Sequence, residues 1–298
     1  MSDSGPSSVA VVRPWGTILA TGPDRISWLN GLVTCDVSKV SEGVGAWGLL
    51  LTKRGKIVAE LTLVSSAEGL FVGTPTGSAD LTRHLEDFLV MEDVELSDQA
   101  SSHVWIQVHG PGALQVASGR AEGEARGRVD WLSSGGAAVV VERARLEACL
   151  AGLRENHELQ VLDESTWEAW RVAHGLPEFG IDFGSDDNPH QAGLDRRAVS
   201  WTKGCYLGQE VVCMQDMRGK VKRSLAKLLL PNELNVDRGD VVKSESGEAV
   251  GSVTSVAATS LLGGQPRAAI AQLHAPHFEP GSTVYLSETP LKTRSLWG

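Results

Sequence analysis

Short apolar runs, each closed by a turn signal, constrain this fold more than any other feature of the sequence. Three such runs follow one another at residues 49–51, 57–64 and 70–72, separated by Lys53-Arg54-Gly55 and Ala67-Glu68-Gly69. Runs of this length between glycine-containing turns are typical of antiparallel hairpins. We therefore predict consecutive hairpins in this part of the chain.

Helical spacing alternates with these strands. Residues 17–21 read as a strand, and Asp24 is placed to cap a helix that follows it. Ser78 is the expected cap of a second helix. A second round of strand, helix, strands and helix is expected at 104–108, from Pro111, near 129–131, at 137–141 and at 143–153. The pattern predicts two α+β units of similar order, residues 1–100 and 101–221.

The rest of the chain divides into a helix, an irregular segment and a set of short strands. A helix is expected over residues 163–174 and should end at Gly175-Leu176-Pro177. Residues 179–194 hold too many turn formers for regular structure, which favours a functional loop. Short strands are then expected near 225–230, 240–242, 249–256, 268–273 and 283–286. We predict a small β-barrel over residues 222–298.

Charge and composition limit the function classes. The 298 residues carry 27 basic and 37 acidic side chains, a formal net charge of −10. No apolar run approaches the ~18 residues that cross a bilayer, and residues 1–10 lack the pattern of a targeting peptide. We therefore expect a cytoplasmic protein without a membrane partner. Four cysteines in a chain of this length predict reduced thiols rather than a disulfide scaffold.

The most informative segment is Lys203-Gly204-Cys205-Tyr206-Leu207-Gly208-Gln209-Glu210. A helix is expected to start at or just after Gly208. Helix-terminal amides and the Lys203 ammonium would both favour the thiolate of Cys205, the form that binds metals and attacks electrophiles. The alternative is a buried cysteine that acts as a small hydrophobe. The residues alone leave both interpretations open.

This segment resembles the hallmark of the YgfZ family, folate-binding proteins of iron-sulfur cluster assembly that are similar in fold to the glycine-cleavage T-protein. Seven of its eight positions match the pattern Lys-Gly-Cys-Tyr-x-Gly-Gln-Glu. The resemblance extends over most of the chain, through Gly22-Pro23-Asp24, Leu29-Asn30-Gly31, Thr34-Cys35-Asp36-Val37, Gly55-Lys56, Gly175-Leu176-Pro177, Gly180-Ile181-Asp182, Pro189, Gly193-Leu194 and Val199-Ser200-Trp201-Thr202. T-proteins have no thiol at the position of Cys205, which favours the YgfZ group over aminomethyltransferases.

The resemblance implies an α+β, three-lobed fold with two ferredoxin-like units around a central channel, and a small C-terminal β-barrel. The channel would hold tetrahydrofolate or a derivative, with the cysteine loop beside it. The implied role is in maturing or maintaining iron-sulfur enzymes, including those that modify tRNA. Iron-sulfur client or assembly proteins are therefore the expected partners.

Site residues carry over by position. Trp15 and Trp167 match tryptophans that line the folate site, where an indole face can stack on a flat ring; without the resemblance, both would be read as core aromatics. The resemblance places the loop of Asp182 at the channel. Lys203 and Tyr206 of the signature complete this part of the expected folate site, with Cys205 as the functional thiol.

The sequence also departs from the related pattern. T-protein relatives carry a glutamate that pairs with the pterin ring where this chain has Gln191, which offers one acceptor oxygen and a donor amide. This substitution puts the affinity and identity of the folate in question. The chain reads Val212-Cys213-Met214 where related chains have Val-Ala-Arg, and Cys213 has no recognised zinc spacing from Cys205. No metal site is predicted.

Basic side chains gather just after the signature. Residues 218–227 contain five of them and no acid: Arg218, Lys220, Lys222, Arg223 and Lys227. Arg218 and its neighbours could meet the glutamate tail of a folate or an acidic partner, or could form a solvated strand face. The net charge of −10 argues against direct tRNA binding through long-range attraction.

Three hypotheses follow from the sequence. The first is a folate-binding accessory protein for iron-sulfur cluster assembly or repair that works through Cys205. The second is a folate-dependent aminomethyl or methyl transferase. The third is a thiol-dependent scaffold that binds partner proteins without folate.

Overall fold

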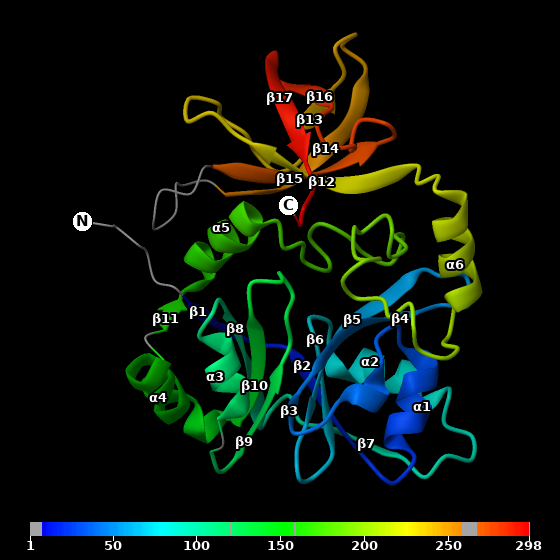
Figure 1. Ribbon diagram of the computed structural model, residues 1–298, viewed down its shortest axis with the longest axis vertical. Helices are drawn as coiled ribbons and strands as arrows, with labels where there is room; N and C mark the ends of the chain where they lie inside the picture. Colours follow the sequence, from blue (N-terminus) through cyan, green and yellow to red (C-terminus); the bar gives the residue numbers. More distant parts are fainter. Residues whose placement is uncertain (1–7, 120, 158, 258–266, 298) are drawn as a thin grey trace. The chain divides into compact units, whose positions relative to one another are not determined.

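A computed structural model describes residues 8–119, 121–157, 159–257 and 267–297 of the chain (Figure 1). The contacts divide the chain into two compact units. The N-terminal unit comprises Pro6–Leu162 and Arg196–Gln209; the described residues of Asp163–Asp195 and Glu210–Gly298 form the C-terminal unit. Residues 1–7, the greater part of the segment searched for a targeting peptide, lie outside the described residues. None of the described helices is long and apolar enough to cross a membrane.

The first sheet of the N-terminal unit is built from the predicted hairpins. Helix α1 (Arg25–Leu32) and helix α2 (Ser78–Glu86) pack against it and share one apolar core with its strands. Gly77 caps α2, so Ser78 is its first residue rather than its cap, and the Ser78 hydroxyl donates to Asp98. The sheet runs in the order β4 (Ala46–Leu51), β5 (Ile57–Ser65), β6 (Leu70–Thr74), β2 (Gly16–Thr21) and β7 (Glu95–Asp98).

The order of the strands in the second sheet could not be predicted from the sequence. Its strands follow the order β11 (Gln160–Leu162), β1 (Val9–Arg13), β8 (His103–His109), β10 (Gly136–Glu142), β9 (Glu124–Arg128) and β3 (Gly43–Val44). Strands β1 and β3 come from the first hundred residues, yet both pair here. The two sheets therefore interleave along the sequence and do not follow a division at residue 100.

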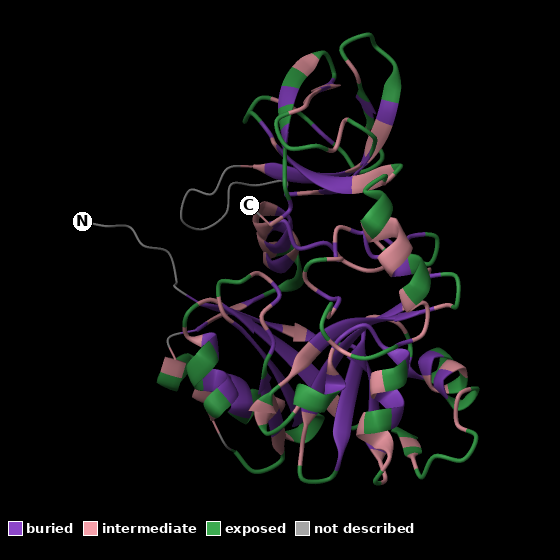
Figure 2. Cartoon of the chain, turned by 45° about the vertical axis from the view of Figure 1, so that its right-hand side comes forward, coloured by how far each residue is buried: buried purple, intermediate pink, exposed green. Residues whose placement is uncertain are grey.

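Helices α3 (Ala113–Ser118) and α4 (Leu146–His157) accompany this second sheet and bury Val116, Leu150 and Leu153 in its core. The strand expected near 129–131 is β9, which ends at Arg128. The helix expected from residue 143 starts with a short 3-10 turn before α4 begins. These shifts of a few residues leave the predicted alternation of strand and helix intact. Figure 2 shows the strands of both sheets largely buried and the helices with exposed faces.

A closed six-stranded barrel lies in the C-terminal unit, as predicted. Alternating side chains such as Ala226, Leu228, Ala269 and Ala271 fill its interior. The sequence missed the last strand, because Pro290, Lys292 and Arg294 interrupt its apolar pattern. The strand order is β12 (Arg223–Leu229), β15 (Ala268–His274), β14 (Ala249–Val256), β13 (Val241–Lys243), β16 (Thr283–Leu286) and β17 (Thr289–Arg294).

Helix α5 (Glu164–His174) begins and ends where the sequence predicts. The Asp163 side chain accepts a hydrogen bond from the backbone N–H of Thr166, which caps the first turn. Gly175 ends the helix with φ of 75°, a left-handed conformation that glycine adopts without strain. Helix α6 (Gln209–Arg218) starts directly after Gly208, also as expected.

Candidate functional site

Lys203 anchors the signature loop to the N-terminal unit. Its ammonium donates hydrogen bonds to the carbonyl oxygens of Asn30, Val33 and Cys35 at 2.5, 2.8 and 2.8 Å. These carbonyls lie at and just after the end of α1, where a helix leaves acceptors without intrahelical partners. Burial lowers the pKa of Lys203, against the opposing influence of Cys35 and Asp36. One cation therefore joins the loop to three points of the first helix.

This arrangement corrects the sequence-based role of Lys203. From the sequence alone, the ammonium is expected near the Cys205 thiol, two residues along the chain. The structure pairs it with three carbonyl oxygens instead, and its charge faces the end of a helix where cations are favoured. Lys203 holds the loop in position.

Backbone contacts fix the rest of the loop. The N–H of Leu207 donates to the carbonyl of Gly31, and the N–H of Ser200 donates to that of Thr34. Gly208 has φ of +81°, and a Cβ at this position would lie 2.5 Å from the carbonyl oxygen of Thr52. Any side chain at position 208 would collide with the backbone of the hairpin between β4 and β5. The loop can therefore follow this path only with glycine there.

Cys205 is exposed at the tip of this anchored loop. Nothing lies within 4 Å of the position where a Cβ would stand on Gly204, whereas Tyr206 on the other side is buried. The Lys203 ammonium lies over the Tyr206 ring, 5.4 Å from its centroid. The loop thus keeps Tyr206 and Lys203 in the protein and leaves the thiol accessible to a partner.

The other cysteines offer a contrast. Burial raises the pKa of Cys35 to about 12, and burial together with Glu124 raises that of Cys149 to about 12. Both stay protonated at neutral pH and pack as small apolar residues. Cys213 is half-buried on α6. The exposed thiol of the chain is therefore the one in the signature loop.

Trp15 has an aromatic neighbour and a buried donor. Its ring lies 5.9 Å from that of Trp105, and the Arg13 guanidinium is 5.7 Å from its centroid. The Trp105 N–H donates to the Thr17 hydroxyl. The Trp15 N–H is buried and finds no hydrogen-bond acceptor among the described residues. Because leaving a buried donor unpaired costs about 1–3 kcal/mol, this atom points to a missing partner.

Trp167 lies on α5 in the C-terminal unit, at the start of a row of stacked rings. Its ring stacks on Trp170 at 5.5 Å, and Trp170 stacks on His174 at 3.9 Å. The spacing of three and four residues places all three on one helix face. Trp167 is itself buried, whereas Trp170 and His174 are half-buried.

Asp182 takes part in a network of buried polar groups. Its side chain accepts hydrogen bonds from Arg171, at 2.7 Å, and from the backbone N–H of Glu178. It also accepts from the hydroxyls of Thr254 and Ser255 on β14. These four donors use the acceptor capacity of a carboxylate. The geometry therefore favours a supporting role for Asp182, joining the loop to the barrel, over direct contact with a ligand.

Gln191 is also engaged within its own loop. Its side-chain oxygen accepts from the backbone N–H of Asn188 at 3.1 Å, and the Asn188 side chain accepts from the N–H of Gln191 at 2.9 Å. This reciprocal pair closes a tight turn. The acceptor oxygen on which the sequence-based folate contact depended is thus shared with the backbone.

The five basic side chains of residues 218–227 lie in different environments. Arg218, the last residue of α6, is exposed, as are Lys220 and Lys222. Arg223 pairs with Asp187 at 2.8 Å, and Lys227 is buried, which lowers its pKa. The predicted positive patch therefore reduces to its first three side chains.

Sequence reasoning missed the residues that support the site. The Arg171 guanidinium is buried and also binds Glu168 through two hydrogen bonds of 2.6 Å. The Thr34 hydroxyl donates to the carbonyl of Ala198 and accepts from the N–H of Leu49. It therefore joins the chain just before the signature loop to β4. A buried arginine on an amphipathic helix could have been noticed, but no spacing signals its partners.

The structure places the predicted site residues in two groups. Trp15, Lys203, Cys205 and Tyr206 belong to the N-terminal unit, and the last three lie together in the signature loop. The C-terminal unit contributes the remaining four: Trp167, Asp182, Gln191 and Arg218.

Comparisons with known proteins agree with this architecture. Residues 8–145 match the GCVT N-terminal domain family. The "tRNA-modifying protein YgfZ" of Aliivibrio fischeri strain MJ11 is 26% identical over 256 residues, which cover 81% of this chain and 77% of that protein. The protein of the same name from Colwellia psychrerythraea is 25% identical over 244 residues, covering 78% and 75%.

A solved structure extends the similarity to the whole fold. The glycine cleavage system aminomethyltransferase T from Bartonella henselae superposes with a TM-score of 0.80 at 18% identity, covering 99% of this chain and 87% of that one. Identity this low shows the fold alone. The α+β class and the closed C-terminal barrel expected from the sequence are thereby confirmed. The chain is thus similar to the YgfZ proteins over most of its length, matches the GCVT N-terminal domain family over residues 8–145, and has the fold of the glycine-cleavage T-protein.

Proposed function

We propose that this protein is a folate-binding accessory protein of iron-sulfur cluster assembly or repair that acts through Cys205. The carrying observation is the exposure of this thiol on a loop whose neighbouring residues are fixed. A thiol binds a metal as the thiolate, so its proton leaves for solvent when the bond forms. The fixed loop reduces the conformational entropy that is lost when a partner engages the thiol.

The folate part of the proposal depends on Trp15 and Trp167. Trp15 is buried, and its N–H lacks an acceptor among the described residues, so we assign this donor to the polar edge of the folate ring. Tetrahydrofolate, when bound, supplies a carrier for one-carbon units. Trp167, which is buried in the C-terminal unit, is assigned to the folate on the resemblance alone, and Lys203 and Tyr206 hold the signature loop in position. We assign the exposed Arg218 to the glutamate tail and Asp182 and Gln191 to the support of the binding loop.

Client proteins would be iron-sulfur enzymes in the cytoplasm, including enzymes that modify tRNA. The name of the Aliivibrio and Colwellia relatives, which calls them tRNA-modifying, supports this assignment. The exposed cations Arg218, Lys220 and Lys222 offer a surface for an acidic partner. The net charge of −10 makes direct attraction of tRNA weak.

The function of the thiol is tested by Cys205→Ser, with Cys213→Ser as the matched control on α6. In cells that lack the chromosomal copy, we expect Cys205→Ser to lose support of an iron-sulfur enzyme that modifies tRNA, read as the amount of modified nucleoside. Cys213→Ser should restore the parent amount. Full activity of Cys205→Ser would contradict the proposal.

Folate binding is tested by calorimetric titration of tetrahydrofolate. Trp15→Phe keeps a ring and removes the N–H, so we expect affinity to fall by about tenfold if the indole donates to the ligand. Trp15→Ala combined with Trp167→Ala should abolish binding, and Cys205→Ser should leave it unchanged. No binding by the parent protein would remove folate from the proposal and favour the thiol scaffold.

The fold similarity to an aminomethyltransferase favours one second candidate, folate-dependent group transfer. Formaldehyde-dependent turnover with glycine-cleavage partners would support it. The position of Cys205 and the engagement of Gln191 in its own turn argue for the accessory role instead.

A further inference from the structure

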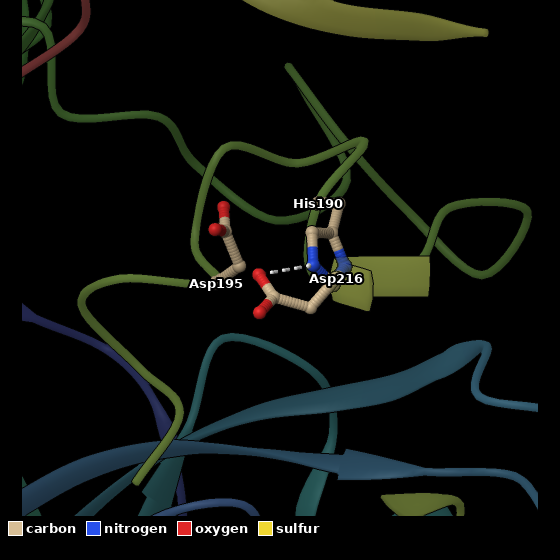
Figure 3. Close-up of side chains that lie close together, drawn as sticks. All are labelled: His190, Asp195 and Asp216. Atoms are coloured by element: carbon tan, nitrogen blue, oxygen red, sulfur yellow. Dashed lines mark ion pairs between the residues drawn. The ribbon is translucent and has the colours of Figure 1, made fainter. Parts of the chain in front are cut away.

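Three side chains of metal-ligating type lie together in the C-terminal unit, outside the signature loop (Figure 3). They are His190 and Asp195 in the irregular segment of residues 179–195, the turn-rich loop, and Asp216 on α6. Each offers one ligand atom, and the three atoms lie within 4.8 Å of one another. The His190 Nε2 atom is 3.5 Å from the Asp216 Oδ1 atom.

These separations suit a shared cation. Bonds from nitrogen and carboxylate oxygen to zinc, a representative transition metal, measure about 2.0–2.2 Å, so two ligand atoms on one ion lie at most about 4.4 Å apart. The 3.5 Å between His190 and Asp216 falls within this range, whereas N–H···O hydrogen bonds centre at about 2.9–3.0 Å. Closing the widest of the three gaps requires a movement of only a few tenths of an ångström.

The backbone around the cluster is held in place. The N–H of Leu194 donates to the carbonyl of Pro189, and the N–H of Gly193 donates to that of His190, which folds residues 190–195 into a tight turn. The Ser224 hydroxyl on β12 donates to the same His190 carbonyl at 3.1 Å. This turn brings His190 and Asp195 close although they are five positions apart in sequence, and Asp216 comes from a regular helix.

The ligand types indicate which cation fits. One imidazole and two carboxylates form a mixed nitrogen and oxygen set, which suits first-row divalent ions such as Mn²⁺ and Fe²⁺ better than thiophilic metals. The neutral imidazole binds the ion, and the two carboxylates balance its charge. His190 is buried, while the two aspartates are half-buried and leave room for water ligands.

We propose that His190, Asp195 and Asp216 form a site for a divalent first-row transition metal that ties the turn-rich loop to α6. The sequence predicted no metal site, because intervals of five and twenty-one residues match no known ligand motif. The site uses no residue of the signature loop, so its existence is independent of the proposed function.

Titration with Mn²⁺ alone tests the site. Free Mn²⁺ gives a six-line electron paramagnetic resonance signal that disappears on binding, and calorimetry gives the stoichiometry. We expect one ion per chain, and at least about tenfold weaker binding in His190→Gln and Asp216→Asn. Asp186→Asn removes an exposed carboxylate from the same loop outside the cluster and should bind as the parent does.

A further variant separates lost ligation from lost folding. Asp216→His keeps a ligand atom, so it should retain metal binding and shift preference from Mn²⁺ towards Zn²⁺. Mn²⁺ should also raise the thermal midpoint of the parent and of Asp186→Asn but not of His190→Gln. Absence of Mn²⁺ binding by the parent, or equal binding by His190→Gln and Asp216→Asn, would overturn the proposal.

Discussion

A few side-chain and backbone atoms fix the signature loop. Their contacts differ from those that their positions in the sequence suggest. Lys203 is two residues from Cys205 in sequence, but its ammonium donates three hydrogen bonds to carbonyl oxygens around the end of α1. Gly208 is required because the Thr52 carbonyl occupies the space of a side chain. The exposed thiol thus depends on neighbours that perform no chemistry themselves.

Gly208→Ala should destabilise the protein. A left-handed backbone costs a non-glycine residue roughly 1–2 kcal/mol, and the added Cβ also meets the Thr52 carbonyl. We expect the free energy of unfolding, measured by urea titration, to fall by at least this amount. Gly204→Ala is the control, since nothing lies within 4 Å of its Cβ position. Equal effects of the two substitutions would contradict the packing argument.

Lys203→Met should loosen the loop rather than alter the chemistry of the thiol directly. It leaves three carbonyls without their charged donor, and each hydrogen bond to a charged group contributes about 1.5–3 kcal/mol. Amide hydrogen exchange of residues 200–208 should become faster, because the loop opens more often. Unchanged exchange at Leu207 would show that backbone contacts alone hold the loop.

At the scale of elements, the sequence predicted helix ends and turns well but strand partners poorly. Local chemistry marks the ends of α5, since Asp163 and Gly175 supply the cap and the left-handed stop. Strand β1 carries no comparable signal for its pairing with β8 and β11, because partners are chosen by packing between distant segments. The partners of Arg171 and the His190 cluster could not be predicted for the same reason. Side chains that are brought together only by the fold have no characteristic spacing in the sequence.

Asp182→Asn should weaken the connection between α5, the turn-rich loop and β14. The substitution replaces one buried carboxylate partner of Arg171 with a neutral amide, while Glu168 and Glu178 still pair with the guanidinium, so the loss should be smaller than the roughly 3–5 kcal/mol typical of a buried charge left without a partner. Calorimetric melting should show a clearly lower thermal midpoint. Asp237→Asn, on an exposed turn of the barrel, should melt as the parent does. A midpoint that matches the parent would show that the network is dispensable.

The molecule as a whole combines two units whose segments interrupt one another in sequence. Residues 196–209 belong to the N-terminal unit, although the chain on both sides belongs to the C-terminal unit. The signature loop therefore belongs to a different unit from the helix that precedes it and the barrel that follows it in the chain.

Acid should destabilise the protein through His174. Burial lowers its pKa, with the nearby Lys227 charge acting in the same direction and a hydrogen bond to Trp170 opposing them. The unfolded state then binds more protons than the folded state below about pH 6.5, so the free energy of unfolding falls as pH drops through this window. His174→Gln should flatten this dependence in urea titrations at several pH values.

The exposed His274 provides the comparison for this prediction, because solvent surrounds it in both states. His274→Gln should keep the parent's dependence on pH. A parent whose stability does not change between pH 7 and 5 would contradict the assignment to His174.

The late position of residues 196–209 has a consequence for synthesis on the ribosome. When Leu162 emerges, both sheets of the N-terminal unit are complete, but the carbonyls of Asn30, Val33 and Cys35 still await the Lys203 ammonium. The nascent chain must first release the helix and turn-rich loop of Asp163–Asp195, and only then add the segment that finishes the earlier unit. Cys205 therefore takes its position late in translation, after the sheets that support its loop have formed.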